Sequence, residues 1–450
     1  MEPAPPEARL SLGRIPLSEA FGFWLRLGLT SFGGPAGQIA LIHAELVERR
    51  GWVSDARFLN ALNFCMLLPG PEAQQLATYL GWTLSGTAGG IAAGTLFVLP
   101  SALLLWILSW AYVTFGSLPW IEGMFNGLKP AILAVVAASV WRIGSRTLTN
   151  RLLWFLAGAA LASLALLKAA VPWILTGAAL AGFAGSHLWP DAPAPPAAAG
   201  SGAPTTPPRL EPDAGANGRN PDPPQAPNVW ASLRAAVLWL AVWWTPVMLL
   251  GTQLGWQHSV SAMGVFFGKA ALLTFGGAYA VLPYVAEQAV GHFHWLSHAQ
   301  MLDGFGLAET TPGPLLIVLQ YVGFLGGWNQ HGQLSPLVSA TLGAFISTWA
   351  TFAPSFFWIF VLAPHVQRFQ SRSQLRHILQ AVTAAVIGLI LHLALWLGRQ
   401  VLFNDTGSPD WFSCGVCVFT LWAMLFRSWS FHWLAAAAAI AAIAKTLILC

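Results

Sequence analysis

The stretch SFGG at residues 31–34 returns as TFGG at residues 274–277, and PGP at residues 69–71 returns at residues 312–314. Both pairs lie at the same offset, since 274 minus 31 and 312 minus 69 both give 243. Glycine and proline interrupt helices. Duplicated interruptions inside apolar sequence point to a transporter whose site lies where the broken segments of the two halves meet.

The composition places this chain in a membrane. Of its 450 residues, 56% are hydrophobic and only 8% are charged, whereas about a quarter of a soluble domain is charged. Apolar runs near 20 residues recur, and they are apolar in blocks rather than alternating, which favours helices over a β-barrel. The expected fold is an all-α polytopic membrane protein in contact with the lipid bilayer. The net charge of +4 reflects loop arginines, and no nucleic-acid partner is expected.

The internal repeat divides the chain into four expected regions. Beyond the first motifs the match continues at an offset of 254, where Pro100-Ser101 meets Pro354-Ser355. The repeats therefore cover residues 21–142 and 264–396. We expect a cytoplasmic tail (1–17), a first transporter domain (18–189), a disordered cytoplasmic linker rich in proline, alanine and glycine (190–229), and a second transporter domain (230–450).

The loops predict an inverted topology. About thirteen apolar segments are expected, with an odd number from one repeat to the next. Arginines gather in the loops 142–151 and 365–376, while the matching loops 399–410 and 112–120 hold one and none. Under the positive-inside rule both arginine-rich loops face the cytoplasm, which puts the N-terminus in the cytoplasm and the C-terminus outside.

The segments around the breaks are short. Residues 21–31, 36–47, 58–68 and 72–82 would each cover about 16 Å, half of a hydrocarbon core of about 30 Å. We interpret them as re-entrant hairpins that meet at the midplane. The alternative is a set of ordinary spanning helices kinked at glycine and proline.

At these motifs the chain resembles the chromate ion transporter family in its long, two-domain form. The matching stretches are FGGPAGQ (32–38), LPGPEAQQL (68–76), TFGGAY (274–279) and ETTPGP (309–314). The resemblance covers both repeats. It implies a secondary active transporter of the bacterial cell inner membrane that exports chromate from the cytoplasm and gives chromate resistance.

Cations at membrane depth are the first candidates for anion binding, because an isolated charge there costs at least about 2.5–3.5 kcal/mol. Arg26 and Lys269 occupy matched positions and could clamp one dianion; alternatively, each neutralises a carboxylate or reaches the interface. Lys129 either contacts the anion or pairs with Glu72 or Glu122. Two amides at matched positions either donate to the anion or join helices; they are Asn126 and Gln380.

The breaks themselves provide a second set of candidates. A helix that starts at a Gly-Pro break exposes its first N–H groups and carries roughly +0.5 charge there, which suits an oxyanion. Four such ends could surround one site; the alternative is that the breaks only permit close packing. The expected substrate-binding residues at the breaks are Ser31, Gly33, Gly34, Gln38, Gly70, Gln75, Thr274, Gly276, Gly277, Thr311 and Gly313.

Two glutamates beside the PGP motifs are the candidates for coupling. Glu72 directly follows the first motif, and Glu309 precedes the second by three residues. A carboxylate beside a dianion repels it unless the carboxylate is protonated or paired with a cation. Proton coupling is therefore one hypothesis, and a static salt bridge with Arg26 or Lys269 is the other.

Other functions are weighed against chromate export. Sulfate or another tetrahedral oxyanion would fit the same site, and a passive anion channel would share the same breaks. No P-loop of the form GxxxxGK[ST] is present, so ATP-driven transport within the chain is not expected. A single C-x-x-C (Cys414 and Cys417) and scattered histidines suggest no enzyme, cofactor or metal site. The oligomeric state is not indicated.

Overall fold

Most of the described residues of this chain lie in helices. The computed structural model describes residues 15–32, 34–116, 118–188, 229–275, 277–365, 373–404, 406–427 and 429–449. Within these ranges the only β-pairing is an isolated bridge between Phe403 and Pro409. The predicted N-terminal tail to residue 14, nearly all of the predicted linker, and the predicted site residues Gly33 and Gly276 lie outside the described residues.

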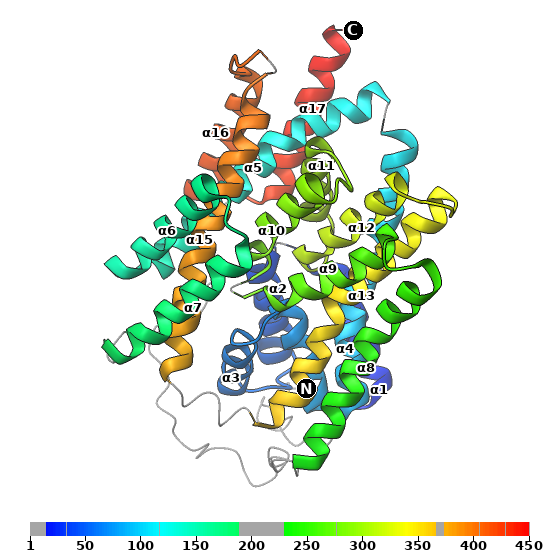
Figure 1. Ribbon diagram of the computed structural model, residues 1–450, viewed down its shortest axis with the longest axis vertical. Helices are drawn as coiled ribbons and strands as arrows, with labels where there is room; N and C mark the ends of the chain where they lie inside the picture. Colours follow the sequence, from blue (N-terminus) through cyan, green and yellow to red (C-terminus); the bar gives the residue numbers. More distant parts are fainter. Residues whose placement is uncertain are drawn as a thin grey trace, which may run out of the picture.

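The first half contains seven α-helices and a π-helical turn, all within the described residues (Figure 1). In chain order they are α1 (Leu17–Thr30), α2 (Gly34–His43), η2 (Ala44–Arg49), α3 (Asp55–Cys65), α4 (Glu72–Phe115), α5 (Pro119–Thr147), α6 (Arg151–Leu167) and α7 (Val171–Leu188).

The second half begins with an additional helix and then follows a similar order. Its described elements are α8 (Val229–Leu254), α9 (Ser259–Leu272), η3 (Ala278–Ala280), α10 (Leu282–Ala286), η4 (Glu287–His292), α11 (His298–Thr310), η5 (Leu315–Ile317), α12 (Val318–Asn329), α13 (Pro336–Leu362), η6 (Ala363–His365), α15 (Ser373–Leu402), α16 (Trp411–Phe426) and α17 (Phe431–Leu449).

Unusual local structure recurs at the sequence offset of 243. The two π-helices η2 and η4 start and end at matched positions. Ser54 caps α3 and Ser297 caps α11, each accepting a hydrogen bond from the backbone N–H three residues later. The two halves therefore share local backbone geometry as well as motifs.

The change of offset from 243 to 254 has a structural cause. In the first half, α4 is bent at Ser85 and Gly86, whose backbone dihedral angles are not helical. In the second half, a separate loop, residues 330–335, joins α12 to α13. The chain thus turns within two residues in the first half, whereas it turns through a separate loop in the second half.

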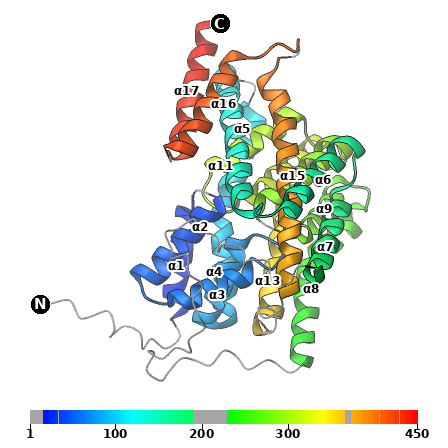
Figure 2. The ribbon, with the colours of Figure 1, turned by 90° about the vertical axis from the view of Figure 1, so that its left-hand side faces the viewer.

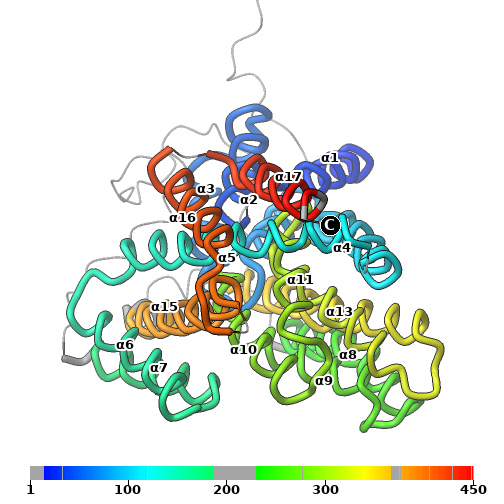
Figure 3. The backbone as a smooth tube through the Cα atoms, turned by 90° about the horizontal axis from the view of Figure 1, so that it is seen from above, coloured from blue at the N-terminus to red at the C-terminus, as the bar shows by residue number. Residues whose placement is uncertain are grey.

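The end helices of each half pack against the other half. Helices α6 and α7 follow α5 in the chain, but they pack against α15. Helices α16 and α17 follow α15, but they pack against α5 (Figure 3). Since α5 also packs against α15, the two halves interlock and form one structure.

The chain is a multi-pass membrane protein. Five described helices are long and apolar enough to cross a membrane, and they lie within α4, α5, α8, α13 and α15. Large apolar side chains stay exposed on the outer helices, with 62% exposure for Trp154, 79% for Leu166 and 76% for Trp173, as expected for a surface that faces lipid. Figure 2 shows α1, α2 and α3 gathered beside the lower part of α4.

Candidate functional site

The two pairs of breaks cross each other near the middle of the molecule. The backbone N–H of Gly70 donates to the carbonyl oxygen of Thr274 at 2.8 Å, and the backbone N–H of Gly313 donates to that of Ser31 at 2.7 Å. These two bonds join matched positions, because 70 and 31 become 313 and 274 at the offset of 243. Each PGP motif is therefore held by the SFGG or TFGG motif of the other half.

Both central glycines are required by their surroundings. Gly70 has a φ angle of +128° and Gly313 one of +112°, values that side chains rarely adopt. A Cβ on Gly70 would lie 2.7 Å from Nε2 of Gln75, and a Cβ on Gly313 would overlap the side chain of Ser101. The crossing is therefore closely packed on both sides.

Buried amides support the crossing. Gln38 donates through Nε2 to the carbonyl oxygen of Gly313 at 2.5 Å, and Gln75 donates through Nε2 to that of Pro69 at 2.8 Å. Both side chains are almost completely buried, and their Oε1 atoms have no hydrogen-bond partner among the described residues. Within the same part of the chain, the buried hydroxyls of Ser31 and Ser355 also have no partner. Polar atoms without partners thus gather around this point.

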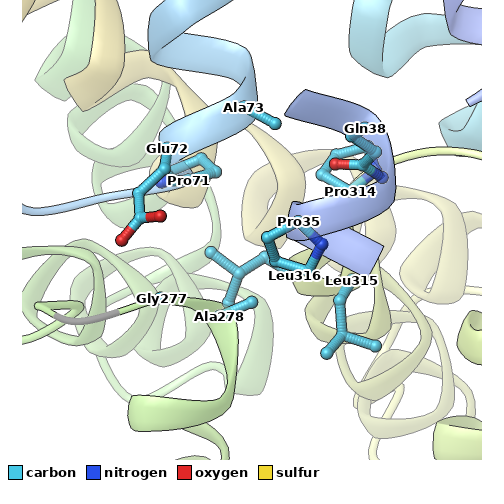
Figure 4. Close-up of a pocket in the computed structure, with 10 residues that line it drawn as sticks. All are labelled: Pro35, Gln38, Pro71, Glu72, Ala73, Gly277, Ala278, Pro314, Leu315 and Leu316. Carbon is cyan, nitrogen blue, oxygen red and sulfur yellow. The ribbon is translucent and has the colours of Figure 1, made fainter. Parts of the chain in front are cut away.

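A pocket lies between the crossing segments (Figure 4). It is lined by Pro35, Gln38, Pro71, Glu72, Ala73, Gly277, Ala278, Pro314, Leu315 and Leu316. The space amounts to about 260 Å³ when the part open to the outside is included. Its enclosed interior is about the size of one water molecule, so a tetrahedral oxyanion would need its walls to move apart.

The lining combines matched positions of the two halves. Pro71 faces the pocket together with its counterpart Pro314, and Glu72 together with its counterpart Leu315. Four helical segments begin at this lining: α2, α4, η3 and η5, the last continuing into α12. The first N–H groups of a helix have no partner within the helix. Among the described residues no Lys, Arg or His lines the pocket, so the helix starts are its source of hydrogen-bond donors.

The two predicted coupling glutamates lie in different surroundings. Glu72 lines the pocket at the start of α4, with its carboxylate toward the segment that carries Gly277 (Figure 4). Glu309 accepts a hydrogen bond of 2.7 Å from the hydroxyl of Tyr279. Among the described residues, neither glutamate forms an ion pair with Arg26 or Lys269.

The predicted cations do not line the pocket. Arg26 and Lys269 are exposed on α1 and α9. Lys129 lies 3.5 Å from Oδ1 of Asp303 and 3.1 Å from Oδ1 of Asn126. Lys129 is thus paired with a carboxylate, but its partner is Asp303 and not the expected Glu72 or Glu122, because α11 packs against α5.

The remaining candidates lie near the crossing or on the helices around it. Gly34 begins α2 with a φ angle of +68°. Thr311 is buried in the turn before the second PGP motif, where its hydroxyl donates to the carbonyl oxygen of Ala308 at 3.1 Å. Gln380 is half-buried on α15, which packs against the α5 helix of Asn126.

The sequence model of the chromate transporter family matches residues 18–183 and 261–443, which is more than half of the chain. The chain belongs to the chromate transporter family.

Relatives of this family align with most of the chain. The chromate transport protein of Cupriavidus metallidurans is 29% identical over 85% of this chain and 82% of its own length. That of Pseudomonas aeruginosa is 31% identical over 83% and 79%. A Bacillus subtilis protein called an uncharacterized transporter is 35% identical over 26% of this chain and 66% of its own length. No solved structure matches the chain.

Sequence reasoning missed several residues at the site of this family member. Ser101 and Ser355 pack against the central glycines of the crossing, and their matched Pro-Ser pairs were the available signal. Asp303 is buried on α11, and a buried acid at membrane depth is itself a signal of function. Tyr279 carried no comparable signal.

Proposed function

We propose that this chain is a secondary active transporter that exports chromate from the cytoplasm across the bacterial inner membrane and so gives chromate resistance. The observation that carries the proposal is the pocket at the crossing, where helical segments from both halves begin. The names of the relatives from Cupriavidus metallidurans and Pseudomonas aeruginosa give the cargo.

The chemistry of the pocket suits a tetrahedral dianion. Each helix start contributes N–H donors and a partial positive charge. Proline is favoured in the first turn of a helix, so the prolines at the breaks fix where these helices begin. Neutral hydrogen-bond donors can bind an oxyanion. They carry no full positive charge that would slow release of the anion. The proposed substrate-binding residues at the crossing are Ser31, Gly33, Gly34, Gln38, Gly70, Gln75, Thr274, Gly276, Gly277, Thr311 and Gly313. Of these, Gly70 and Gly313 shape the site, since their N–H groups already donate across the crossing. Lys129, Asn126 and Gln380 are proposed to lie along the path, and Arg26 and Lys269 at its entrances.

The proposed topology consists of two inverted repeats in about thirteen membrane segments. The arms next to the breaks are short: α1 has 14 residues, α2 has 10 and α3 has 11. Arms of this length support hairpins that re-enter the membrane and meet at its midplane, as in other transporters built from inverted repeats. In this arrangement the N-terminus is cytoplasmic and the C-terminus periplasmic.

The membrane potential is large enough to drive this export. Moving one charge across 100 mV is worth about 2.3 kcal/mol, so a dianion leaving a negative interior gains about 4.6 kcal/mol. We further propose that the carboxyl of Glu72 takes up a proton before a dianion enters the pocket. This proton would lower the energy gained from the membrane potential. One proton moving with each dianion would leave one net charge and about 2.3 kcal/mol per 100 mV.

Chromate uptake into everted membrane vesicles tests the proposal. Respiring vesicles that contain the chain should accumulate chromate, and an uncoupler should abolish the accumulation. Valinomycin with potassium removes the potential and leaves the pH gradient, which separates the two driving forces. Conductance that does not saturate with chromate would indicate a channel. Sulfate accumulation faster than chromate accumulation would make sulfate the cargo, and movement of neither ion would refute the proposed function.

A further inference from the structure

A buried charge network lies apart from the pocket. Nζ of Lys129 is 3.5 Å from Oδ1 of Asp303, and the hydroxyl of Tyr112 donates to Oδ2 of Asp303 at 2.8 Å. The side chains of Lys129 and Asp303 are only 20% and 7% exposed. The ring of Tyr321 packs against that of Tyr112, with 5.7 Å between centroids, and Tyr321 is completely buried.

This network joins the two halves. Lys129 lies on α5 and Tyr112 on α4, whereas Asp303 lies on α11. The contact between α11 and α5 is close, since a Cβ on Gly306 would lie 2.7 Å from Cδ1 of Ile132. A buried ion pair resists separation strongly, because parting the charges leaves each one buried alone. Moving α11 away from α5 therefore requires that this pair be broken.

The matched positions carry no charge. Lys129 corresponds to Thr383 at the offset of 254, and Asp303 corresponds to Asn60 at the offset of 243. The packing differs in the same way: α11 packs against α5, but α3 has no comparable contact with α15 among the described residues. Figures 1 and 2 place α11 and α5 in the upper part of the molecule and α3 in the lower part. The α11 side of the pocket is therefore closed by a tight helix contact and a charge pair, and the α3 side has no equivalent contact among the described residues.

We infer that the Lys129–Asp303 pair is the gate that closes the periplasmic side of the pocket, and that this structure is the state with that side closed. The inference rests on the proposed function, since it requires a pocket that opens alternately to the two sides. Release of the anion then involves α11 leaving α5 and the charge pair breaking. In this closed state both residues hold the two helices together, and neither lies in the pocket lining; Lys129 becomes free to meet the anion on its path only when the pair breaks.

Access to a cysteine in the pocket tests the gate without any transported ion. Ala73→Cys places a thiol on the pocket lining in a chain whose four native cysteines are replaced by serine. A membrane-impermeant methanethiosulfonate is applied to right-side-out and to everted vesicles, and the rate of labelling is measured from each face. The gate variants are Asp303→Asn and the double variant Lys129→Gln with Asp303→Asn, which leaves no buried charge unpaired. Asn60→Ala and Thr383→Ala are the matched controls.

The expected result is slow labelling from the periplasmic face in the parent chain. Both gate variants should raise that rate about fivefold or more, and the exchanged pair Lys129→Asp with Asp303→Lys should lower it again. The controls should leave it unchanged. Unchanged periplasmic labelling in the inserted, folded double variant would overturn the inference, as would an equal increase in the controls. Absence of chromate transport would refute the proposed cargo but leave this result standing.

Discussion

The backbone N–H of Gly70 donates to the carbonyl oxygen of Thr274 at 2.8 Å, so a break in the first half of the chain is completed by a break in the second. The matched bond from Gly313 to Ser31 completes the exchange. Neither pair of breaks can form its local structure alone, because the polar backbone groups exposed at each break find partners in the other half. Folding of the site therefore depends on both halves together.

The central glycine of the second PGP motif should not tolerate a side chain. Gly313→Ala would force a Cβ into Ser101 at a φ angle of +112°, and such backbone strain costs about 1–3 kcal/mol before the overlap is counted. We expect a lower melting temperature in detergent and at least a tenfold loss of chromate uptake into everted vesicles, the factor that about 1.4 kcal/mol represents.

Gly34 supplies the matched control. It also has a positive φ angle, +68°, but an added Cβ would meet nothing within 4 Å. Gly34→Ala should therefore cost only about 1–2 kcal/mol of backbone strain. Adding Ser101→Gly should relieve part of the defect of Gly313→Ala and leave Gly34→Ala unaffected. Equal melting temperatures in the two alanine variants would contradict the packing argument.

Arg26 and Lys269 should act on the approach of the anion. Both side chains are exposed and neither lines the pocket, so their charges act at a distance that salt screens. In Arg26→Ala and Lys269→Ala the apparent KM for chromate should rise several-fold at low ionic strength, with little change in maximal rate. The difference from the parent chain should shrink at high salt.

A different outcome would indicate that these two residues contact the bound anion. If either variant loses maximal rate at saturating chromate, and added salt does not narrow the difference, the cation contacts the bound anion in another state of the transport cycle. Lys445→Ala is a control for exposed charge elsewhere, since Lys445 is also exposed and lies on α17, 3.9 Å from Asp410.

Glu309 should affect the response to a pH gradient more than the movement of chromate itself. Its carboxylate accepts a hydrogen bond from Tyr279 and lies outside the pocket lining. Glu309→Gln should keep chromate exchange across vesicles at equilibrium but lose stimulation by an imposed pH gradient. Tyr279→Phe keeps the carboxyl and removes one buried hydrogen bond, which costs about 1–3 kcal/mol of stability. A Glu309→Gln variant that still responds to the pH gradient would remove Glu309 from coupling.

The breaks were predictable from sequence because glycine and proline act locally. The positive φ angles of Gly70 and Gly313 are ones that glycine adopts readily. Which break meets which was not predictable, since that depends on how distant helices pack. The partner of Lys129 was missed for the same reason: Asp303 reaches it only because α11 lies against α5.

The position of Arg26 shows a second limit. The offset shows that Arg26 and Lys269 correspond, but correspondence does not fix the direction in which a side chain points. Helix α1 buries Phe23, Trp24 and Leu27, and at about 100° per residue Arg26 falls outside that face. The helical spacing of the residues in α1 therefore predicts that Arg26 points away from the buried face.

The last prediction concerns the single charge in the pocket. Glu72 lines the pocket, and its counterpart in the other half is Leu315. The part of the lining that the structure describes therefore holds one carboxyl and no basic side chain. At 4 Å and an effective dielectric constant near 20, two unit charges interact by about 4 kcal/mol, which is large enough to exclude a dianion while Glu72 is ionised. Protonation removes this repulsion, so uptake should rise as the pH on the loading side falls.

Glu72→Gln makes the side chain neutral at every pH. The variant should bind the anion as well at high pH as at low pH, and its uptake should lose most of the pH dependence of the parent chain. Uptake is measured at several pH values on the loading side with the membrane potential clamped by valinomycin and potassium. Sulfate, which stays a dianion across this range, separates titration of the protein from titration of chromate, and Glu72→Asp keeps the carboxyl as a control. If the Gln variant and the parent chain give the same pH profile with sulfate, Glu72 does not control entry, and the proton that accompanies the anion must be carried elsewhere.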